Sequence, residues 1–472
     1  MKLVIPVMTA GPVAWGWGIR GFCIMRKGTH RFTKKFLRQN GLKVLSDNAQ
    51  SFIFDSSNVF AWEITSNTLF GYWAEPLSRL PYKKKTFQNP YDHFDSEFFQ
   101  RQTLILNISH FCTMECVYCC AGGGSYNSPR MNMPLETACR AIDWLRKTKR
   151  LTIILFGGEP MCNPDVATEI VRYAIDMGSL RGMEVDFNLN TNGTISLKQF
   201  PKLIDLILQS NFEVIVSIDG AAEVQNKNRP LIGRQSSYSI VSKNLVELLK
   251  LLGPEKVTAK VTMQWDVRYI SSLIDPLLEL GVRKVLATPI VKSTNFCENE
   301  VNFTHDEYNL MLERDRIFLN WYIDRLIYDP DLRIQPYHKL LSVLYQSLSI
   351  SQYCLAGIRI FCVYPNGDVY PCHRFSGESE IMLGNLNNDN EIKTFNSQLP
   401  VGRYSACEKC FTKHICWGNR CLQQNRVRGQ SLFGVNDPLS CVYQKNNLKL
   451  LLSAISRVPS KNRERSFAIR PQ

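Results

Sequence analysis

The sequence contains no uninterrupted apolar run long enough to cross a bilayer, which argues against a helical membrane protein. It also lacks the aromatic and arginine motifs of the standard RNA-binding folds, which makes a nucleic-acid partner unlikely on these grounds. An apolar run after Lys2 resembles a signal peptide, but Pro6 and Pro12 break any helix there. We therefore expect a soluble, cytoplasmic protein with no membrane partner.

Cysteine, by contrast, is abundant, with 16 residues in a chain of 472. A chain of this length should hold two or three domains with large cores, so it does not need disulfides to fold. Short, clustered cysteine spacings without a secretory context favour metal ligation in a reducing compartment.

Three cysteines follow an apolar, strand-like stretch from Thr103 to Ile108 with the spacing Cys112-x3-Cys116-x2-Cys119. Three thiolates are one fewer than an ordinary 4Fe-4S cluster takes, so one iron would stay open for another ligand. The alternative is a zinc site, but zinc sites use four ligands, usually in paired Cys-x2-4-Cys units.

A second group of cysteines occupies the C-terminal third of the chain. Its eight members match the ligand count of two further 4Fe-4S clusters: Cys354, Cys362, Cys372, Cys407, Cys410, Cys416, Cys421 and Cys441. One or two structural zinc sites are the alternative, because Cys407-x2-Cys410 alone would suit zinc.

Apolar strands alternate with amphipathic helices between these two groups. The predicted strands are Thr103 to Ile108, Leu151 to Phe156, Glu184 to Leu189, Glu213 to Ile218, Val257 to Met263 and Lys284 to Thr288. The predicted helices are Leu135 to Lys149, Asp165 to Gly178, Leu197 to Ser210, Tyr238 to Leu252 and Ile270 to Leu280. This order predicts an α/β fold with a parallel sheet curled into a partial (β/α)6 TIM-like barrel, whose functional residues gather at the carboxyl ends of the strands.

The motifs obey that rule, because Cys112 follows the first strand, Gly157-Gly-Glu-Pro160 the second, Asn190-Thr-Asn-Gly193 the third and Asp219-Gly220 the fourth. With Tyr118 before the third cysteine, this pattern resembles the radical S-adenosylmethionine (SAM) enzymes over roughly residues 100 to 445. In that superfamily, the open iron binds the amino and carboxylate groups of SAM, and an electron from the cluster yields a 5′-deoxyadenosyl radical.

The C-terminal cysteines and the run Tyr370-Pro-Cys372-His-Arg-Phe resemble the SPASM extension of peptide-modifying radical SAM enzymes. The resemblance implies three 4Fe-4S clusters and SAM, with one cluster on the Cys112 triad and two auxiliary clusters on the other eight cysteines. One departure concerns Cys421: four residues separate it from Cys416, whereas the family usually has three, so its cluster assignment stays open.

The same resemblance assigns the cofactor-binding residues. Those expected to contact SAM or its cluster are Tyr118, Gly157, Gly158, Glu159, Pro160, Asn192, Ser217 and Arg229. The glycines would let the backbone approach the methionyl amine, since glycine tolerates unusual backbone angles, and Glu159 would supply a charged acceptor. The alternative for each of Ser217 and Arg229 is a structural role, either capping a helix or bracing a loop.

The expected function is radical modification of a ribosomally synthesised precursor peptide, with a thioether or carbon–carbon crosslink as product. Sulfatase maturases, a sister group that makes formylglycine, place an Asp base after the equivalent of Cys372, where this chain has His373. An imidazole titrates near neutrality and could act as the base, although a structural role is equally common. Formylglycine formation and cofactor maturation remain alternatives, as does, from another class, a non-catalytic iron-sulfur or zinc protein that binds nucleic acid.

We expect an N-terminal peptide-recognition region at 1–100, a radical SAM barrel at 101–300, a helical linker at 301–350, the SPASM domain at 351–445 and a basic tail at 446–472.

The net charge is +14, and residues 1–100 and 442–472 each carry +6. Basic flanks suggest an acidic peptide leader as partner, besides an electron donor such as flavodoxin or ferredoxin, although solvated charge is the commoner explanation. Alternation from Ser51 to Ile64 predicts a hairpin turning at Ser56 to Asn58, with an exposed edge that could accept a peptide strand.

Overall fold

The computed structural model describes residues 100–126, 128–264, 267–290, 304–345, 355–375, 377–388, 392–394, 421–423 and 438–467, the single residues 410, 412 and 416, and six strands between residues 25 and 76. Two predicted ligands, Cys354 and Cys407, lie outside the described residues. Within the parts of the chain that are described, no helix is long and apolar enough to cross a membrane.

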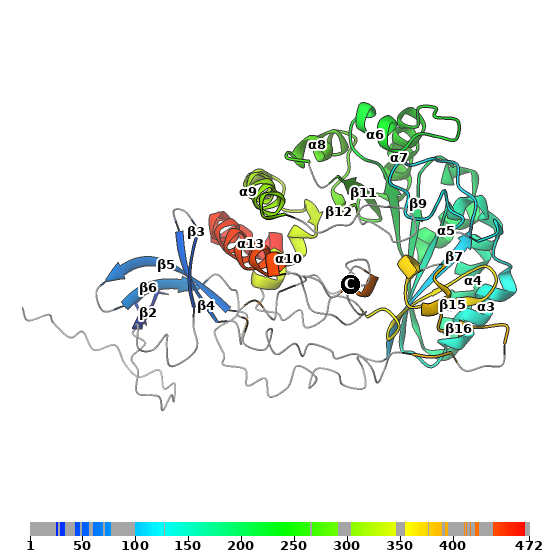
Figure 1. Cartoon of the computed structure of the whole chain (residues 1–472), viewed down its shortest axis with the longest axis horizontal. Coiled ribbons are helices and arrows are strands. Elements are labelled where there is room, and N and C mark those ends of the chain that lie inside the picture. Colours follow the sequence, from blue (N-terminus) through cyan, green and yellow to red (C-terminus); the bar gives the residue numbers. More distant parts are fainter. Residues whose placement is uncertain are drawn as a thin grey trace, which may run out of the picture.

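A ten-stranded sheet forms the body of the protein, in the order β13-β12-β11-β10-β9-β8-β7-β14-β15-β16 (Figure 1). Its middle strands are β7 (Arg101–Ser109), β8 (Arg150–Gly157), β9 (Glu184–Thr191), β10 (Asn211–Ser217), β11 (Val257–Met263) and β12 (Lys284–Pro289). These six strands run parallel to one another, and each coincides with a strand that the sequence predicts. The α/β class with a parallel sheet is confirmed.

Further strands extend the sheet at both ends. β13 (Arg333–Gln335) pairs in parallel with β12, and β14 (Ile360–Val363) pairs in parallel with β7. β15 (Asp368–Tyr370) and β16 (Gly384–Asn385) continue from β14 in antiparallel fashion. The pairing of β14 with β7 places the cysteine-rich C-terminal segment beside the strand that leads into the Cys112 triad.

Five predicted helices are present as α3 (Leu135–Trp144), α4 (Pro164–Arg181), α5 (Pro201–Gln209), α7 (Tyr238–Leu252) and α8 (Ser271–Glu279). α3 ends five residues earlier than predicted, because the backbone amides of Lys149 and Arg150 already bond to the Gln100 carbonyl. Leu197–Gln199 is a separate 3-10 turn, since Pro201 starts a new helix. The short helix α6 (Ala222–Asn228) was not predicted.

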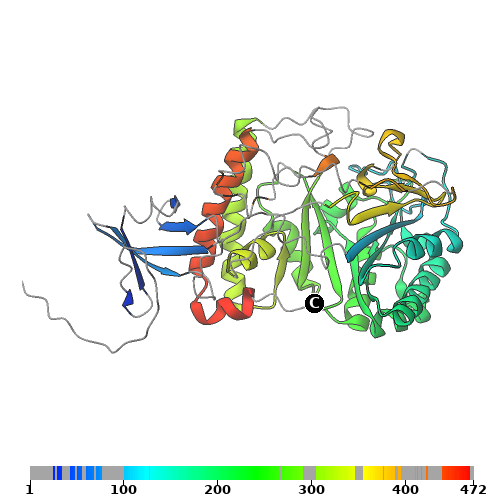
Figure 2. The same ribbon diagram turned by 90° about the horizontal axis from the view of Figure 1, so that it is seen from below.

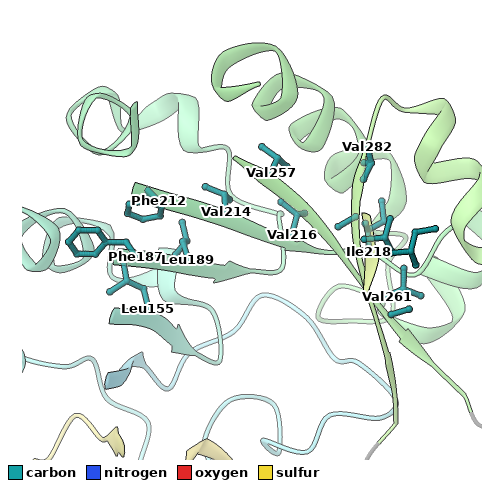
Figure 3. Close-up of a cluster of buried hydrophobic side chains, with 14 of the residues drawn as sticks. Leu155, Phe187, Leu189, Phe212, Val214, Val216, Ile218, Val257, Val261 and Val282 are labelled. Atoms are coloured by element: carbon teal, nitrogen blue, oxygen red, sulfur yellow. The ribbon is translucent and has the colours of Figure 1, made fainter. Parts of the chain in front are cut away.

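The first face of the sheet packs against the helices. Alternate strand residues such as Leu155, Leu189, Val216 and Val261 are completely buried there (Figure 3). On the same face, the rings of Phe187 and Phe212 stack with their centroids 5.5 Å apart. This core is the main source of stability for the sheet, because burial of apolar surface is the dominant favourable term in folding.

The second face, which we call the inner face, carries a smaller core. Ile105, Ile154 and Phe156 point to it from β7 and β8, and Cys362 from β14. They pack against aromatic side chains of the C-terminal extension, Tyr364, Tyr370 and Phe375. The inner face is therefore partly covered by the segment that holds the second group of cysteines.

The stretch from residue 303 to 349, predicted to be helical, contains a strand. α9 (His305–Tyr328) and α10 (Tyr337–Tyr345) flank β13, so the helical prediction is wrong for Arg333–Gln335. α9 begins with a capping box, in which Thr304 and Glu307 bond reciprocally to each other's backbone amides. The strand was missed because three residues are too few to show an alternation.

Residues that were expected to form a basic tail belong largely to two packed helices, α13 (Pro438–Arg457) and α14 (Ser460–Phe467). Leu452, Ile455 and Phe467 are completely buried. Arg463 donates to the Ser456 and Val458 carbonyls at 2.8 and 2.7 Å, and Arg465 pairs with Asp331 at 2.9 Å. Two positive charges of this segment therefore have partners within the chain.

A six-stranded antiparallel sheet lies at the N-terminal side, in the order β1-β2-β6-β5-β4-β3. Its strands are β1 (Met25–Arg26), β2 (Thr29–Thr33), β3 (Lys43–Asp47), β4 (Gln50–Asp55), β5 (Phe60–Thr68) and β6 (Gly71–Pro76). β3 contacts α13, which places this sheet beside the C-terminal helices (Figure 2).

The predicted hairpin is present, because β4 and β5 pair with Asp55 opposite Phe60. The exposed edge that was predicted for this hairpin is absent from the described sheet. β4 also pairs with β3, and β5 with β6, so both hairpin strands are interior. The edges of this sheet are β1 and β3, and the prediction of a free edge on the hairpin is wrong.

Candidate active site

Four loops carry the candidate site residues, and they follow the consecutive strands β7, β8, β9 and β10. Neighbouring strands of a parallel sheet end at the same edge, so these loops meet. Hydrogen bonds between the loops show the contact directly: the amides of Gly158 and Glu159 donate to the Ser109 and Phe111 carbonyls at 2.8 and 2.7 Å.

The loop with Cys112, Cys116 and Cys119 is held by backbone pairing to the segment after α6. The Glu115 and Val117 amides donate to the Pro230 and Asn228 carbonyls, each at 2.9 Å. All three cysteines are free thiols, and each is partly exposed. The loop is thus fixed by main-chain bonds while its sulfur atoms stay available.

Burial raises the pKa of the Cys112 thiol, and it raises that of Cys116 to about 11 against the opposing influence of Arg229. The thiols are therefore protonated near neutral pH until a metal displaces the protons, as is usual for cysteine ligands.

A 4Fe-4S cluster fits this donor set. Soft thiolates are the ligands that iron-sulfur clusters take, one on each iron. Three thiolates leave one iron of such a cluster without a protein ligand, whereas structural zinc sites usually take four protein ligands.

Gly157 and Gly158 pack directly against the cysteine loop. A β-carbon on Gly157 would lie 2.4 Å from the Ser109 carbonyl oxygen, and one on Gly158 would lie 2.5 Å from that of Phe111. Gly157 also has a φ of 142°, which side chains rarely adopt. Close contact with the cysteine loop is thus sufficient to explain why both positions are glycine. The predicted approach of SAM would be a second reason.

Glu159 is completely buried and joins two loops. Its carboxylate accepts hydrogen bonds from the Met161 amide (3.0 Å), the Thr191 hydroxyl (2.8 Å) and the Asn192 amide (2.6 Å). Burial raises its pKa, and the same three bonds oppose the rise. Glu159 fixes the loop after β9 to the loop after β8, and its predicted contact with SAM stays a prediction.

A buried charged network lies beside the triad. The Tyr118 hydroxyl donates to Asp219 at 2.5 Å and accepts from Arg229 at 2.9 Å. Asp219 also accepts from the backbone amide of Thr262 at 3.0 Å. Burial lowers the pKa of Arg229, but Tyr118, Cys116 and Asp219 outweigh it and the pKa is raised, so the guanidinium stays charged.

Arg229 has spare hydrogen-bonding capacity next to the cysteines. Its side chain is buried, and its Nε has no hydrogen-bond partner among the described residues. Buried donors are nearly always paired in folded proteins, so an unpaired one beside Cys116 points to an acceptor supplied by a ligand.

The structure also places the other predicted cofactor-binding residues. The Asn192 side-chain amide donates to the Thr113 hydroxyl at 2.9 Å and lies 3.6 Å from the Cys112 sulfur. Pro160 starts a buried 3-10 turn after the glycine loop. Ser217 ends β10 with its side chain half-buried. The predicted residues of all four loops therefore lie at the same edge of the sheet.

The sequence placed Asp219 at the end of the fourth strand but predicted no role for its side chain. In the structure this carboxylate accepts from Tyr118 and from the Thr262 amide. No motif marked Thr113 and Thr194, whose hydroxyls are 2.7 Å apart.

The C-terminal cysteines are brought together only in part. Arg374 links two of them: its backbone amide lies 3.4 Å from the Cys372 sulfur, and its guanidinium lies 3.8 Å from the Cys421 sulfur. Cys362 is buried on β14, and the Cys410 sulfur lies 3.1 Å from the Thr412 hydroxyl. Cys416 and Cys441 are partly exposed. The grouping of these eight cysteines into clusters stays a prediction.

His373 lies on the inner face, with its ring centroid 4.7 Å from that of Phe156. Burial, assisted by Arg374 and Lys260, lowers its pKa to about 3. A base is most effective when its pKa is near the working pH, so this environment disfavours His373 as a proton acceptor. Its catalytic role stays a prediction.

The Radical SAM superfamily model matches residues 106–263, which include the triad, the glycine loop, Asp219 and Arg229. The chain carries a radical SAM domain. A domain of this superfamily implies a 4Fe-4S cluster and SAM as cofactors, and the protein is an enzyme.

Several known proteins are similar to this chain. It is 22% identical to the cysteine-type anaerobic sulfatase-maturating enzyme of Clostridium novyi (strain NT), over 74% of this chain and 95% of the relative. It is 34% identical to the AdoMet-dependent heme synthase of Methanosarcina barkeri (strain Fusaro / DSM 804), over 26% of this chain and 32% of the relative.

Among solved structures, native anSMEcpe with bound AdoMet and Kp18Cys peptide matches with a TM-score of 0.60 at 16% identity. The match covers 75% of this chain and 98% of that chain. At this identity the likeness concerns the fold alone.

Proposed function

We propose that this radical SAM enzyme modifies a peptide substrate, with the reacting group held on the inner face of the sheet. The observation that carries the proposal is the unpaired, buried Nε of Arg229 beside the cysteine triad. A guanidinium in that position suits a carboxylate such as the one on SAM.

The proposal assigns a role to each of the residues that lie at this edge of the sheet. Cys112, Cys116 and Cys119 would hold three irons, and Arg229 would orient a carboxylate beside them. Asp219 and Tyr118 keep Arg229 in place. When bound, the cluster and SAM supply a carbon-centred radical that can remove a hydrogen atom from a C–H bond.

A peptide substrate is supported by what the similar proteins are named for. One is a sulfatase-maturating enzyme, and the solved structure of similar fold contains a cysteine-bearing peptide. We propose a ribosomally made precursor peptide, whose acidic leader would be attracted by the positive charge of residues 1–100.

The proposal includes a SPASM domain with two auxiliary 4Fe-4S clusters on the C-terminal cysteines. The Arg374 guanidinium near the Cys421 sulfur supports it, because cationic groups commonly stabilise thiolates. The backbone amide of Arg374 also donates to the Cys372 sulfur. An electron donor such as flavodoxin or ferredoxin would reduce the triad cluster. Such clusters need a reducing compartment, so the proposed location is the cytoplasm.

A thioether or carbon–carbon crosslink is the proposed product, and formylglycine is the second candidate. The residue type favours the first, because the sulfatase maturases place an Asp base where this chain has His373.

The product separates these two candidates. We expect synthetic precursor peptides, drawn from neighbouring reading frames, to lose hydrogen atoms and keep their sulfur when incubated anaerobically with enzyme, SAM and reductant. Mass spectrometry would detect the change, with enzyme lacking SAM as control. Replacement of cysteine sulfur by oxygen would instead establish formylglycine formation.

The auxiliary clusters can be tested separately from SAM chemistry. Cys372→Ala should remove about four irons, one cluster, from the anaerobically reconstituted enzyme. SAM cleavage without peptide should persist, because the triad is intact. Cys139→Ala is the matched control, since this partly exposed thiol on α3 lies outside both cysteine groups. Equal iron content in the two variants would exclude Cys372 as a ligand.

A further inference from the structure

Three side chains from two loops form a closed ring of hydrogen bonds beside the cysteine triad. The Asn192 side-chain nitrogen, Nδ2, donates to the Thr113 hydroxyl at 2.9 Å, and the Thr113 and Thr194 hydroxyls lie 2.7 Å apart. The Thr194 hydroxyl donates to Asn192 Oδ1 at 2.7 Å, which closes the ring. Because Thr113 directly follows Cys112, the ring joins the loop after β9 to the cysteine loop.

The direction of each bond in this ring is fixed. Asn192 Oδ1 also accepts from the backbone amide of Thr194 at 3.0 Å, so a flipped Asn192 side chain would place two donors against each other. The Thr194 hydroxyl uses its single hydrogen on Oδ1, and the Thr113 hydroxyl therefore donates to Thr194. Each hydroxyl thus donates once and accepts once within the ring.

One hydrogen of the Asn192 side-chain amide remains outside the ring. An Asn side chain has two N–H donors, and the Thr113 hydroxyl takes one of them. Nδ2 also lies 3.6 Å from the Cys112 sulfur, within range of a hydrogen bond to sulfur. The backbone amide of Asn192 donates to Glu159 at 2.6 Å, so the main chain of this buried residue is held as well. The second N–H is therefore available to Cys112 in a fixed position.

A donor beside a ligand sulfur influences the electron affinity of a metal centre. Hydrogen bonds to the sulfur ligands are among the factors that set the reduction potential of iron-sulfur clusters. An N–H directed at a thiolate stabilises the reduced form more, because that form carries one more negative charge. The bond has the same sign for the free thiol: burial raises the pKa of Cys112, and the bond from Asn192 opposes that rise.

We propose that Asn192 donates an N–H···S hydrogen bond to Cys112 that raises the reduction potential of the triad cluster, and that Thr113 and Thr194 are positioning residues that direct this donor. The inference rests on the 4Fe-4S cluster that the proposed function assigns to the triad. It gives Asn192 a role besides the predicted contact with SAM. The reduction takes one electron from a donor such as flavodoxin or ferredoxin, and Asn192 transfers no proton because it stays a neutral amide.

The test is a redox titration of the full-length, anaerobically reconstituted enzyme, followed by electron paramagnetic resonance. The signal that is missing from the Cys triad variant belongs to the triad cluster. Asn192→Leu should make reduction of this cluster about tenfold less favourable, which for one electron is a shift of about 59 mV to lower potential. Iron analysis would show that the cluster is still present.

The Thr194 variants test the ring while Asn192 itself stays in place. Thr194→Val should also shift the potential of the triad cluster downward, and Thr194→Ser, which keeps the hydroxyl, should retain the wild-type value. Thr258→Val is the matched control, because this buried hydroxyl bonds to Glu213 near the amino end of β11, away from the loops of the site. Its potential should equal that of wild type.

A second readout is the coupling of exchangeable protons to the reduced cluster, measured by electron-nuclear double resonance before and after exchange into deuterium oxide. Asn192→Leu should lack one coupling that wild type shows. Wild-type potential and couplings in Asn192→Leu with full iron content would overturn the proposal, as would a wild-type potential in Thr194→Val. If Asn192→Leu loses the triad iron, the two Thr194 variants decide the question. A wild type without any triad signal would instead refute the proposed cluster, and this inference with it.

Discussion

Replacing Cys112, Cys116 and Cys119 together with Ala should remove about four of about twelve irons from the reconstituted enzyme and abolish reductive cleavage of SAM. These are the thiols of the loop that follows the carboxyl end of β7. Iron analysis and chromatography of 5′-deoxyadenosine measure the two effects.

The Cys139→Ala enzyme serves again as the control and should match wild type in both measurements. Because the triad loop is held by backbone bonds to Asn228 and Pro230, the triple variant should stay folded, which circular dichroism would show. A triple variant that keeps all its iron would show that the triad does not bind a cluster. Stoichiometric zinc with only traces of iron in wild type would refute the assignment of iron-sulfur clusters altogether.

The substitution Gly158→Ala should reduce SAM cleavage nearly as severely, although it alters no ligand. The added β-carbon would lie 2.5 Å from the Phe111 carbonyl oxygen and 2.9 Å from the Gly124 α-carbon, and both are backbone atoms that no side-chain rotation can move. The cysteine loop must shift, so we expect loss of about four irons together with loss of activity.

Gly182→Ala is the matched control for this change. Gly182 has a φ of 63° at the end of α4, but nothing lies within 4 Å of the position of an added β-carbon. Its expected effect is a loss of stability of about 1 kcal/mol from the backbone alone, with full iron content and activity. If the Gly158 variant behaves like the Gly182 variant, the close contact of the glycine and cysteine loops has no role in holding the cluster.

The sequence predicted the part of the fold that follows a repeating pattern. Six strands and five helices alternate at regular spacing, and the loops after four of those strands carry recognisable residues. The strand-end rule then placed the triad, Gly157, Gly158 and Asn192 at one edge without further information.

The rest depends on contacts between distant segments, which local patterns do not show. The parallel pairing of β14 with β7 joins residues that are more than 250 positions apart. The burial of α13 and α14 depends on apolar residues spaced among charges, and the charges dominated the interpretation of that segment. Strand pairing on both sides of β4 and β5 likewise removed the free edge that their alternation suggested.

In the candidate site, too, local sequence patterns predicted one part, and contacts between distant segments determine the rest. Residue types predicted the triad, but not that Asp219, Tyr118 and Arg229 form one network, nor that Glu159 bonds to three groups of the chain itself.

The most direct test of the central claim is the fate of SAM with the purified, anaerobically reconstituted wild-type enzyme and a strong reductant. The site predicts 5′-deoxyadenosine and methionine even without peptide, at a rate that depends on Arg229 and disappears in the Cys triad variant. An enzyme that contains all its iron, binds SAM and yet forms no deoxyadenosine under these conditions would contradict the account.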